Sequence, residues 1–193
     1  MFKGIIFDFN GTLFWDSEKH QDAWREFSKR LRTPGFTDEE MRDYMFGRTN
    51  EDIIKYLIGK QPSKEMVENF AKEKEAVYRD MCRNDKENTV LAPGAIKFLD
   101  YLKENNIPHT IATMSEKDNV DFFIEEFQLA NWFDIDKIVY SDGTIPGKPA
   151  PDIYIKASKN LGLAPQDCIV VEDAVSGIES ARTAGIGKII AIA

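Results

Sequence analysis

The chain has 193 residues, of which 42% are hydrophobic and 30% charged, as in ordinary soluble globular proteins. Its 33 acidic and 25 basic residues give a net charge of −8, which argues against non-specific binding to nucleic acid or to an anionic membrane. Cys82 and Cys168 lie far apart, so neither a disulfide framework nor a zinc site is predicted. Because no signal peptide or membrane-spanning stretch is recognisable, we expect a cytoplasmic protein with no nucleic-acid or membrane partner.

An apolar run near the N-terminus, Ile5-Ile6-Phe7, has the pattern of a buried parallel strand. It ends at Asp8, and Gly11 then allows a sharp turn. Ligands of open α/β sheets bind beyond the carboxyl ends of the strands, so Asp8 is placed for chemistry. A plain surface turn after a strand would have a similar sequence.

The next stretch has helical patterns and no strand. Helices are predicted over 18–31 and 37–46, the second opening with Thr37 and Glu40 in the spacing of a capping box. A third helix is expected to follow Thr49, and Ser63 starts a fourth, long helix.

From Pro93-Gly94 onward, helices alternate with short apolar runs, which predicts strands at 109–113, 137–140, 168–172 and 188–192. This βαβ pattern indicates an α/β fold with a parallel, Rossmann-like sheet. We expect residues 1–15 and 88–193 to form the core, and residues 16–87 to form an inserted all-α cap. The chain stops in or just after the apolar run 188–193, so a closing helix or strand is expected beyond it.

Polar residues stand where three of these strands end, and parallel strands bring such ends to one edge of a sheet. Phosphoryl transfer needs a nucleophile, a hard cation held by oxygen atoms, and fixed positive charge near the phosphate. A Mg²⁺ ion suits such carboxylates, and a lysine in a proline-rich loop supplies the fixed charge. The residues concerned are Asp8, Thr113, Ser115, Lys148, Glu172 and Asp173.

On these residues the chain resembles the haloacid dehalogenase superfamily of phosphohydrolases, in particular its β-phosphoglucomutase-like and phosphoglycolate-phosphatase-like group with a helical cap. The resemblance implies that Asp8 is the nucleophile and forms an aspartyl-phosphate, and that Thr113 and Lys148 hold the phosphoryl group. It is carried by four ordered motifs: Asp8-Phe9-Asn10-Gly11-Thr12, then Thr113, then Lys148 in Gly-Lys-Pro-x-Pro-Asp, then Glu172-Asp173-Ala174-x-x-Gly177.

The same resemblance implies a Mg²⁺ site formed by Asp8, the backbone carbonyl of Asn10 and Asp173, with Glu172 acting behind these ligands. It also implies that several residues bind substrate or phosphate. His20 could equally be a packed histidine, and Arg48 a solvated surface residue. These binding residues are Gly11, Thr12, Met114 and Ser115 in the core, and His20 and Arg48 in the cap.

Two positions depart from the family's pattern. Asn10 stands where the family carries its general acid/base, a role typically worth about 10²–10⁴-fold in rate. Asn50 stands where β-phosphoglucomutases carry an arginine for the distal phosphate, which speaks against a mutase.

Three hypotheses follow from these residues. The leading one is a Mg²⁺-dependent phosphatase of a small phosphorylated metabolite, expected to be a monomer, with Asn10 either natural and slowing turnover or introduced to trap an intermediate. The second is a weakly active protein that binds a phosphorylated metabolite for regulation. The third is another phosphoryl transfer: β-phosphoglucomutase-like transfer, acyl-phosphate hydrolysis, or carbon-phosphorus cleavage, for which Lys55 is a candidate.

Overall fold

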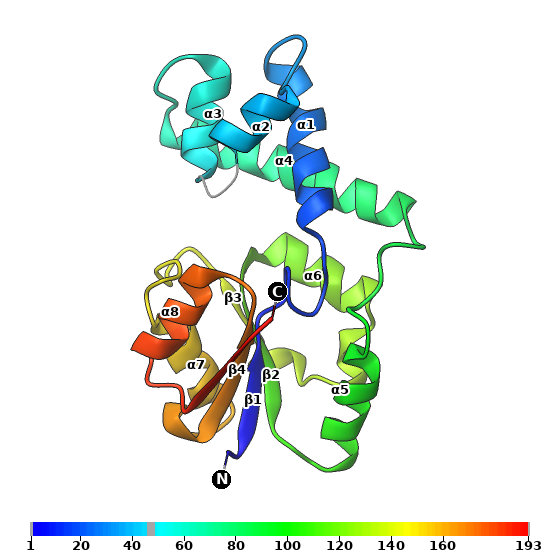
Figure 1. Ribbon diagram of the computed structural model, residues 1–193, viewed down its shortest axis with the longest axis vertical. Helices are drawn as coiled ribbons and strands as arrows, with labels where there is room; N and C mark the ends of the chain where they lie inside the picture. The colour runs from blue at the N-terminus through cyan, green and yellow to red at the C-terminus, as the bar shows by residue number, and fades with distance from the viewer. Residues whose placement is uncertain (1, 46–48, 193) are drawn as a thin grey trace. The chain divides into compact units, whose positions relative to one another are not determined.

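The computed structural model describes residues 2–45 and 49–192 of the protein. The chain divides into two compact units, a core and a cap (Figure 1). The core unit comprises Met1–Trp15 and Val90–Ala193, and the cap unit comprises Asp16–Thr89.

The core unit is built on a parallel sheet with strand order β3-β2-β1-β4-β5. The first strand lies in the middle of the sheet, where it pairs with β2 on one side and β4 on the other. Its four residues are all buried, as the apolar run predicted. The strands are β1 (Gly4–Phe7), β2 (His109–Glu116), β3 (Val139–Ser141), β4 (Cys168–Glu172) and β5 (Lys188–Ala191).

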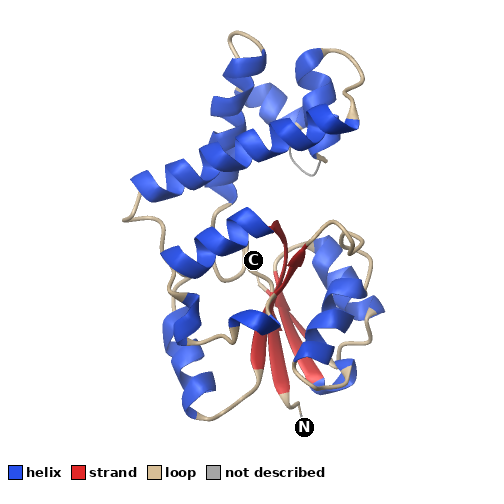
Figure 2. Ribbon diagram, turned by 180° about the vertical axis from the view of Figure 1, so that it is seen from behind, coloured by secondary structure: helices blue, strands red, loops and turns tan. Residues whose placement is uncertain are grey.

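Helices cover both faces of this sheet (Figure 2), so its strands are protected as parallel strands require. Ile6, Val139 and Val170 of the sheet pack with Ile153 and Tyr154 in a buried core. The α/β, Rossmann-like fold predicted from the sequence is thereby confirmed. The helices of the core unit are α5 (Ala95–Glu104), α6 (Lys117–Glu126), α7 (Asp152–Asn160) and α8 (Val175–Thr183), with short 3₁₀ turns at Leu129–Asn131, Ile135–Lys137 and Pro165–Asp167.

One strand is longer than predicted. The β2 strand continues past Thr113 to Glu116, and its pairing with β3 shifts register between Ala112 and Glu116. Such an irregularity re-aims side chains at a strand end. Thr113 and Ser115 therefore lie in the irregular last part of the strand and not in a loop after it.

The cap unit is entirely helical over its described residues. Thr37 forms the predicted capping box with Glu40, and Thr49 and Ser63 also cap helices with their side chains. The apolar faces meet in a separate core that contains Trp24, Phe27 and Ile54. The helices are α1 (Ser17–Leu31), α2 (Asp38–Tyr44), α3 (Asn50–Ile58) and α4 (Lys64–Asn84).

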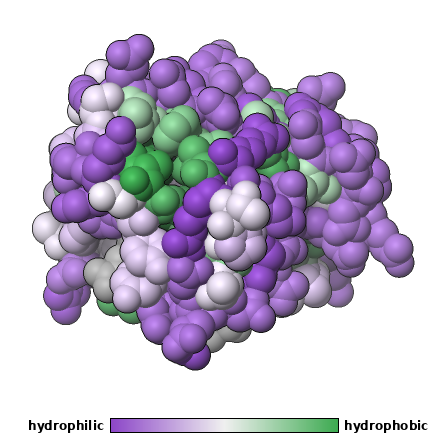
Figure 3. All heavy atoms as spheres, turned by 90° about the horizontal axis from the view of Figure 1, so that it is seen from above, coloured by the Kyte–Doolittle hydropathy of each residue, from purple (hydrophilic) through white to green (hydrophobic). Residues whose placement is uncertain are grey.

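The surface seen in Figure 3 is mostly hydrophilic, with hydrophobic residues confined to a limited area. This agrees with a chain in which 30% of the residues are charged. Among the described residues, no helix combines the length and the apolar character needed to cross a membrane.

Candidate active site

The loop after β1 carries Asp8 to the carboxyl edge of the sheet and is fixed by aromatic packing beneath it. Phe9 stacks on Phe123 of α6 with ring centroids 4.4 Å apart, and Phe14 packs against Phe127 at 4.8 Å. The backbone N–H of Asp8 donates to the carbonyl of Val171 in β4, 3.0 Å away. These contacts anchor the loop on both sides of its polar residues.

Gly11 lets this loop approach the residue after β4. Its φ of +80° lies in the left-handed region, and a Cβ atom at this position would lie 2.2 Å from the Asp173 Oδ2 atom. The neighbouring Thr12 hydroxyl donates to Asp173 Oδ1 over 3.2 Å. Gly11 and Thr12 therefore bring Asp8 and Asp173 to the same place, as the sequence predicted.

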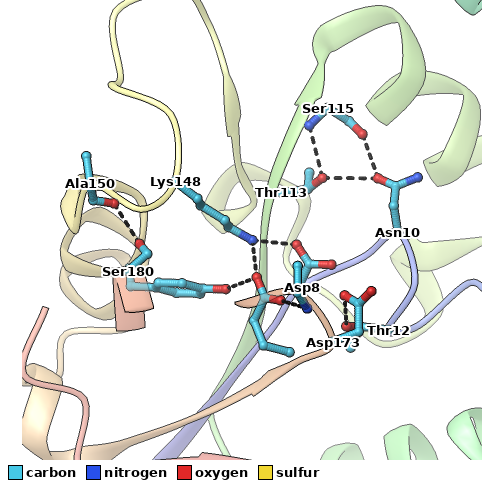
Figure 4. A network of polar contacts seen from close by, with 12 residues as sticks. Asp8, Asn10, Thr12, Thr113, Ser115, Lys148, Ala150, Asp173 and Ser180 are labelled. Atoms are coloured by element: carbon cyan, nitrogen blue, oxygen red, sulfur yellow. Dashed lines mark hydrogen bonds and ion pairs between the residues drawn. The ribbon is translucent and has the colours of Figure 1, made fainter. Parts of the chain in front are cut away.

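Lys148 joins this edge from the loop before α7 (Figure 4). Its Nζ atom lies 2.6 Å from Asp8 Oδ1 and 2.5 Å from Glu172 Oε1, and all three side chains are at least nine-tenths buried. Glu172 also accepts the Tyr154 hydroxyl at Oε1, over 2.8 Å, and the Ala174 backbone N–H at Oε2, over 2.9 Å. Glu172 is thus held by three donors, which makes it a support for Lys148.

Gly177 of α8 provides the space for Glu172. A Cβ atom there would lie 1.6 Å from Glu172 Oε1, so any side chain would displace the carboxylate. This explains in physical terms the glycine of the fourth motif. The support from Tyr154 was missed by the sequence reasoning, and its place in the helix that follows Lys148 was the available signal.

Burial and charge shift the titration of this group. Burial raises the pKa of Asp8 from 3.8 to about 7, although the Lys148 ammonium opposes the change. Burial alone would lower the pKa of Lys148, but the carboxylates of Asp8 and Glu172 outweigh it and raise that pKa. Burial, with the charge of Glu172, also raises the pKa of Asp173. The carboxylates therefore lack enough positive charge around them.

The donor set fits a hard divalent cation. Asp8, Glu172 and Asp173 each offer an oxygen atom, and these atoms lie within 4.8 Å of one another. One lysine faces these three carboxylates, so a cation with two charges would neutralise the group. Because Glu172 already receives three hydrogen bonds, Asp8 and Asp173 are the better direct ligands, and oxygen-only sites of this kind suit Mg²⁺.

A second polar group forms where β2 ends (Figure 4). The Ser115 hydroxyl donates to Asn10 Oδ1 over 2.7 Å, and the Thr113 hydroxyl makes a longer contact of 3.4 Å with the same atom. Thr113 Oγ1 in turn accepts the Ser115 backbone N–H over 3.1 Å. The side chain of Met114, between them, packs against the hydrophobic core. Asn10, Thr113 and Ser115 are thus brought together beside Asp8.

The two cap residues have different outcomes. His20 lies in the cap unit, where its ring stacks on Tyr78 at 4.0 Å and its Nδ1 atom lies 2.8 Å from Nζ of Lys74. Arg48 lies outside the described residues. Sequence reasoning missed Lys74, whose spacing from Phe70 and Tyr78 on α4 was the one signal that it faces inward.

A buried carboxylate, a lysine and a candidate cation site at the carboxyl edge of a parallel sheet are the parts expected of an α/β hydrolase of the phosphoryl-transfer type. The family comparison agrees: residues 5–191 match the model of the haloacid dehalogenase-like hydrolase family. The chain belongs to this family and is a phosphohydrolase of it, which confirms the resemblance drawn from its motifs.

Similar proteins are known from bacteria and from Entamoeba histolytica. The phosphorylated carbohydrates phosphatase of Thermotoga maritima is 28% identical over 194 residues, covering 98% of this chain and 85% of that protein. The β-phosphoglucomutase of Bacillus subtilis is 27% identical, with coverages of 95% and 80%. A crystal structure of a HAD hydrolase, family IA, variant 3, from Entamoeba histolytica has a TM-score of 0.90 at 46% identity, with coverages of 96% and 82%.

Proposed function

We propose that this protein is a Mg²⁺-dependent phosphatase that hydrolyses a small phosphorylated metabolite through an aspartyl-phosphate on Asp8. The observation that carries the proposal is the buried contact of Lys148 with Asp8 and Glu172, 2.6 and 2.5 Å long, beside Asp173. A buried ion pair that only stabilises the fold would need one carboxylate beside Lys148. Phosphoryl transfer can use all three, because one acts as nucleophile, one positions the lysine and one helps to hold the cation.

The metal would be held by Asp8 and Asp173, with the backbone carbonyl of Asn10 as a further oxygen ligand. When bound, Mg²⁺ supplies charge that offsets the phosphate and favours the ionised form of Asp8. Thr12 and Gly11 support this role, because the Thr12 hydroxyl donates to Asp173 and Gly11 leaves room for its carboxylate.

The chain's own residues then divide the work. Asp8 attacks phosphorus, and the Lys148 ammonium stabilises the charge on the phosphoryl oxygens as the transition state forms. Glu172, held by Tyr154 and the Ala174 N–H, fixes the position of Lys148. The hydroxyls of Thr113 and Ser115 donate to Asn10 and so hold its side chain beside the phosphoryl group. Water then attacks phosphorus and returns Asp8 to its free form.

The names of similar proteins support a small phosphorylated metabolite as substrate. One is called a phosphorylated carbohydrates phosphatase, another hexitol phosphatase A and a third fructose-1-phosphate phosphatase. Each matches at least 95% of this chain at 27–28% identity, so the support reaches the substrate class and no particular compound.

One observation favours a second candidate, a protein that binds a phosphorylated metabolite for regulation. Asn10 stands two residues after Asp8, and its amide cannot donate or accept a proton in catalysis. In such a regulatory protein, the phosphorylated metabolite would bind tightly and be hydrolysed slowly.

The test is a phosphatase assay over a panel of phosphate compounds, with Mg²⁺ or with a chelator. We expect released phosphate only with Mg²⁺, and none from the Asp8→Asn variant. The matched control is Asp136→Asn, because Asp136 is exposed and precedes the amino-terminal end of β3, away from the carboxyl ends of the strands. Binding of a compound without phosphate release, by a protein of unchanged fold, would favour the regulatory candidate.

A further inference from the structure

The carboxamide of Asn10 has a defined orientation. Its Oδ1 atom accepts the Ser115 hydroxyl at 2.7 Å and is contacted by the Thr113 hydroxyl at 3.4 Å. Thr113 Oγ1 already accepts the Ser115 N–H, so its own proton is directed toward Asn10. Figure 4 shows the amide nitrogen on the side away from both hydroxyls. Strand β2 therefore fixes which end of the amide is a donor.

An amide held in this way can donate a hydrogen bond but cannot transfer a proton. A carboxyl group in the same place could give a proton to a departing alkoxide, which typically raises the rate by about 10²–10⁴-fold. Lys148 is an unsuitable substitute, because its ammonium group is held between the carboxylates of Asp8 and Glu172. The site therefore favours leaving groups that need no proton.

We propose that the substrates of this site are acyl phosphates, the mixed anhydrides of a carboxylic acid and phosphoric acid, in preference to alkyl phosphate esters. The inference rests on the proposed function and narrows its substrate class. A carboxylate leaves as a stable anion because its conjugate acid has a pKa of about 4. An alkoxide resembles hydroxide, a far stronger base than a carboxylate, and leaves poorly without a proton.

The first step forms one bond to phosphorus and breaks another. An oxygen atom of Asp8 forms a bond to phosphorus, and the bond between phosphorus and the acyl oxygen breaks. Its electron pair stays on that oxygen, which departs as a carboxylate without taking up a proton. The products are the free carboxylate and the phosphorylated form of Asp8.

In the second step, the amide of Asn10 cannot accept a proton from the attacking water. Water forms a bond to phosphorus, the bond between phosphorus and Asp8 breaks, and its electron pair returns to the Asp8 carboxylate. The proton released by the water passes to a phosphoryl oxygen or to solvent. This step is therefore slower than the first, and phosphorylated Asp8 accumulates during turnover.

The experiment compares acetyl phosphate with glucose 6-phosphate in the native protein and in Asn10→Asp, both with Mg²⁺. We expect native kcat/KM to favour acetyl phosphate, and Asn10→Asp to shift the ratio toward glucose 6-phosphate by about 10²–10⁴-fold. Each substrate makes the same contacts with the rest of the site in both proteins, so those contacts cancel when the two kcat/KM ratios are compared. Asn69→Asp, an exposed position on α4, should leave the ratio unchanged.

A second readout is the intact mass of the native protein quenched during turnover. With acetyl phosphate, one added phosphoryl group should appear, and it should be absent from Asp8→Asn and much reduced in Asn10→Asp. Intact mass also detects any deamidation at Asn10-Gly11 that would imitate the variant.

The inference and the proposed function fail differently. An unchanged substrate ratio in an active Asn10→Asp enzyme would overturn the inference and leave the phosphatase in place. Absence of both turnover and phosphorylation in the native protein and in folded Asn10→Asp, with either substrate, would remove the proposed function itself and the inference with it.

Discussion

The core unit and the cap unit each bury a lysine above a tyrosine whose hydroxyl donates to a buried carboxylate. In the core, Lys148 lies 5.1 Å from the ring centroid of Tyr154, which donates to Glu172. In the cap, Lys74 lies 5.8 Å from the ring of Tyr78, which donates to Asp16. Both clusters thus contain a lysine, a tyrosine and a buried carboxylate, and they differ in how well their charges balance.

The cap cluster satisfies itself. Because an ammonium group has only donors, Lys74 must donate to Nδ1 of His20, so the other ring nitrogen carries the proton and faces Asp16 at 3.3 Å. Lys74 also pairs with Glu75 at 2.7 Å, and the Glu75 side chain is 20% exposed. Asp16, the one buried carboxylate among the described cap residues, accepts the Tyr78 hydroxyl and faces the His20 ring. The charge of Lys74 is balanced by Glu75.

The core cluster is short of positive charge. Asp8 and Glu172 are both buried and share Lys148, and the exposed Asp173 adds a further negative charge beside them. A polar cluster that exists only for stability would not retain this excess, because buried unpaired charge is costly. The two clusters therefore differ in charge balance, and a bound cation would restore that balance in the core.

The largest expected effect comes from removing the exposed member of the core cluster. Asp173→Ala should abolish Mg²⁺ binding measured by calorimetry and lower phosphatase turnover by on the order of 10³-fold, since a bound metal contributes several kcal/mol to such transition states. The fold should be retained because the side chain is exposed. Asp136→Ala is the matched control, and undiminished Mg²⁺ affinity in Asp173→Ala would refute the metal site.

The next effect compares the two lysines. Lys148→Met leaves the carboxylates of Asp8 and Glu172 facing each other, so we expect a loss of about 3–5 kcal/mol in the free energy of unfolding without Mg²⁺. Lys74→Met removes the contacts of Lys74 with His20 and the partly exposed Glu75, and should lose less because only one carboxylate loses its partner. Urea unfolding measures both, with the exposed Lys159→Met as reference. Equal losses would mean that the clusters do not differ as described.

A third effect is the pH dependence of Mg²⁺ stabilisation. The folded-state pKa of Asp8 is raised from 3.8 to about 7, so without metal its contribution to stability is greatest below pH 4 and is lost as the pH rises toward 7. The loss amounts to a few kcal/mol. Since Mg²⁺ binds the ionised form, the gain in stability on adding Mg²⁺ should be larger at pH 8 than at pH 5.5.

Urea unfolding with Mg²⁺ or with a chelator, at both pH values, measures this gain. Asp8→Asn removes the titrating group and should remove most of the difference between the two pH values. A gain that is independent of pH in the native protein would place the metal away from Asp8.

The sequence predicted the core cluster better than the cap cluster, for a physical reason. Parallel strands bring their carboxyl ends together whatever the details of packing, so Asp8 and Asp173 could be placed at one edge of the sheet from the ends of their strands. Lys74 lies in the run Lys72-Glu73-Lys74-Glu75, where only the phase of the helix tells a buried lysine from an exposed one. The register shift at the end of β2, where Thr113 and Ser115 contact Asn10, depends on pairing with β3, which local sequence does not encode.

The smallest expected effect is a difference in anion binding between variants of Tyr154 and Tyr78, whose stability losses should be similar. Tyr154→Phe and Tyr78→Phe each remove one hydroxyl that donates to a buried carboxylate and keep the ring, so each should lose about 1.5–3 kcal/mol of stability. Burial raises the pKa of both hydroxyls, aided by the adjacent carboxylate, so both remain donors at neutral pH. By stability alone the two variants should resemble each other.

Binding of an anion should distinguish them. Glu172 without the Tyr154 hydroxyl holds Lys148 less firmly, so Tyr154→Phe should weaken the binding of vanadate in the presence of Mg²⁺ and lower kcat. Tyr78 donates to Asp16 of the cap cluster, so we expect Tyr78→Phe to leave vanadate affinity close to that of the native protein. Vanadate titration of both folded variants measures this contrast. A loss of vanadate affinity in Tyr78→Phe as large as in Tyr154→Phe would show that the cap cluster takes part in anion binding, and the division between a supporting network and a site would have to be abandoned.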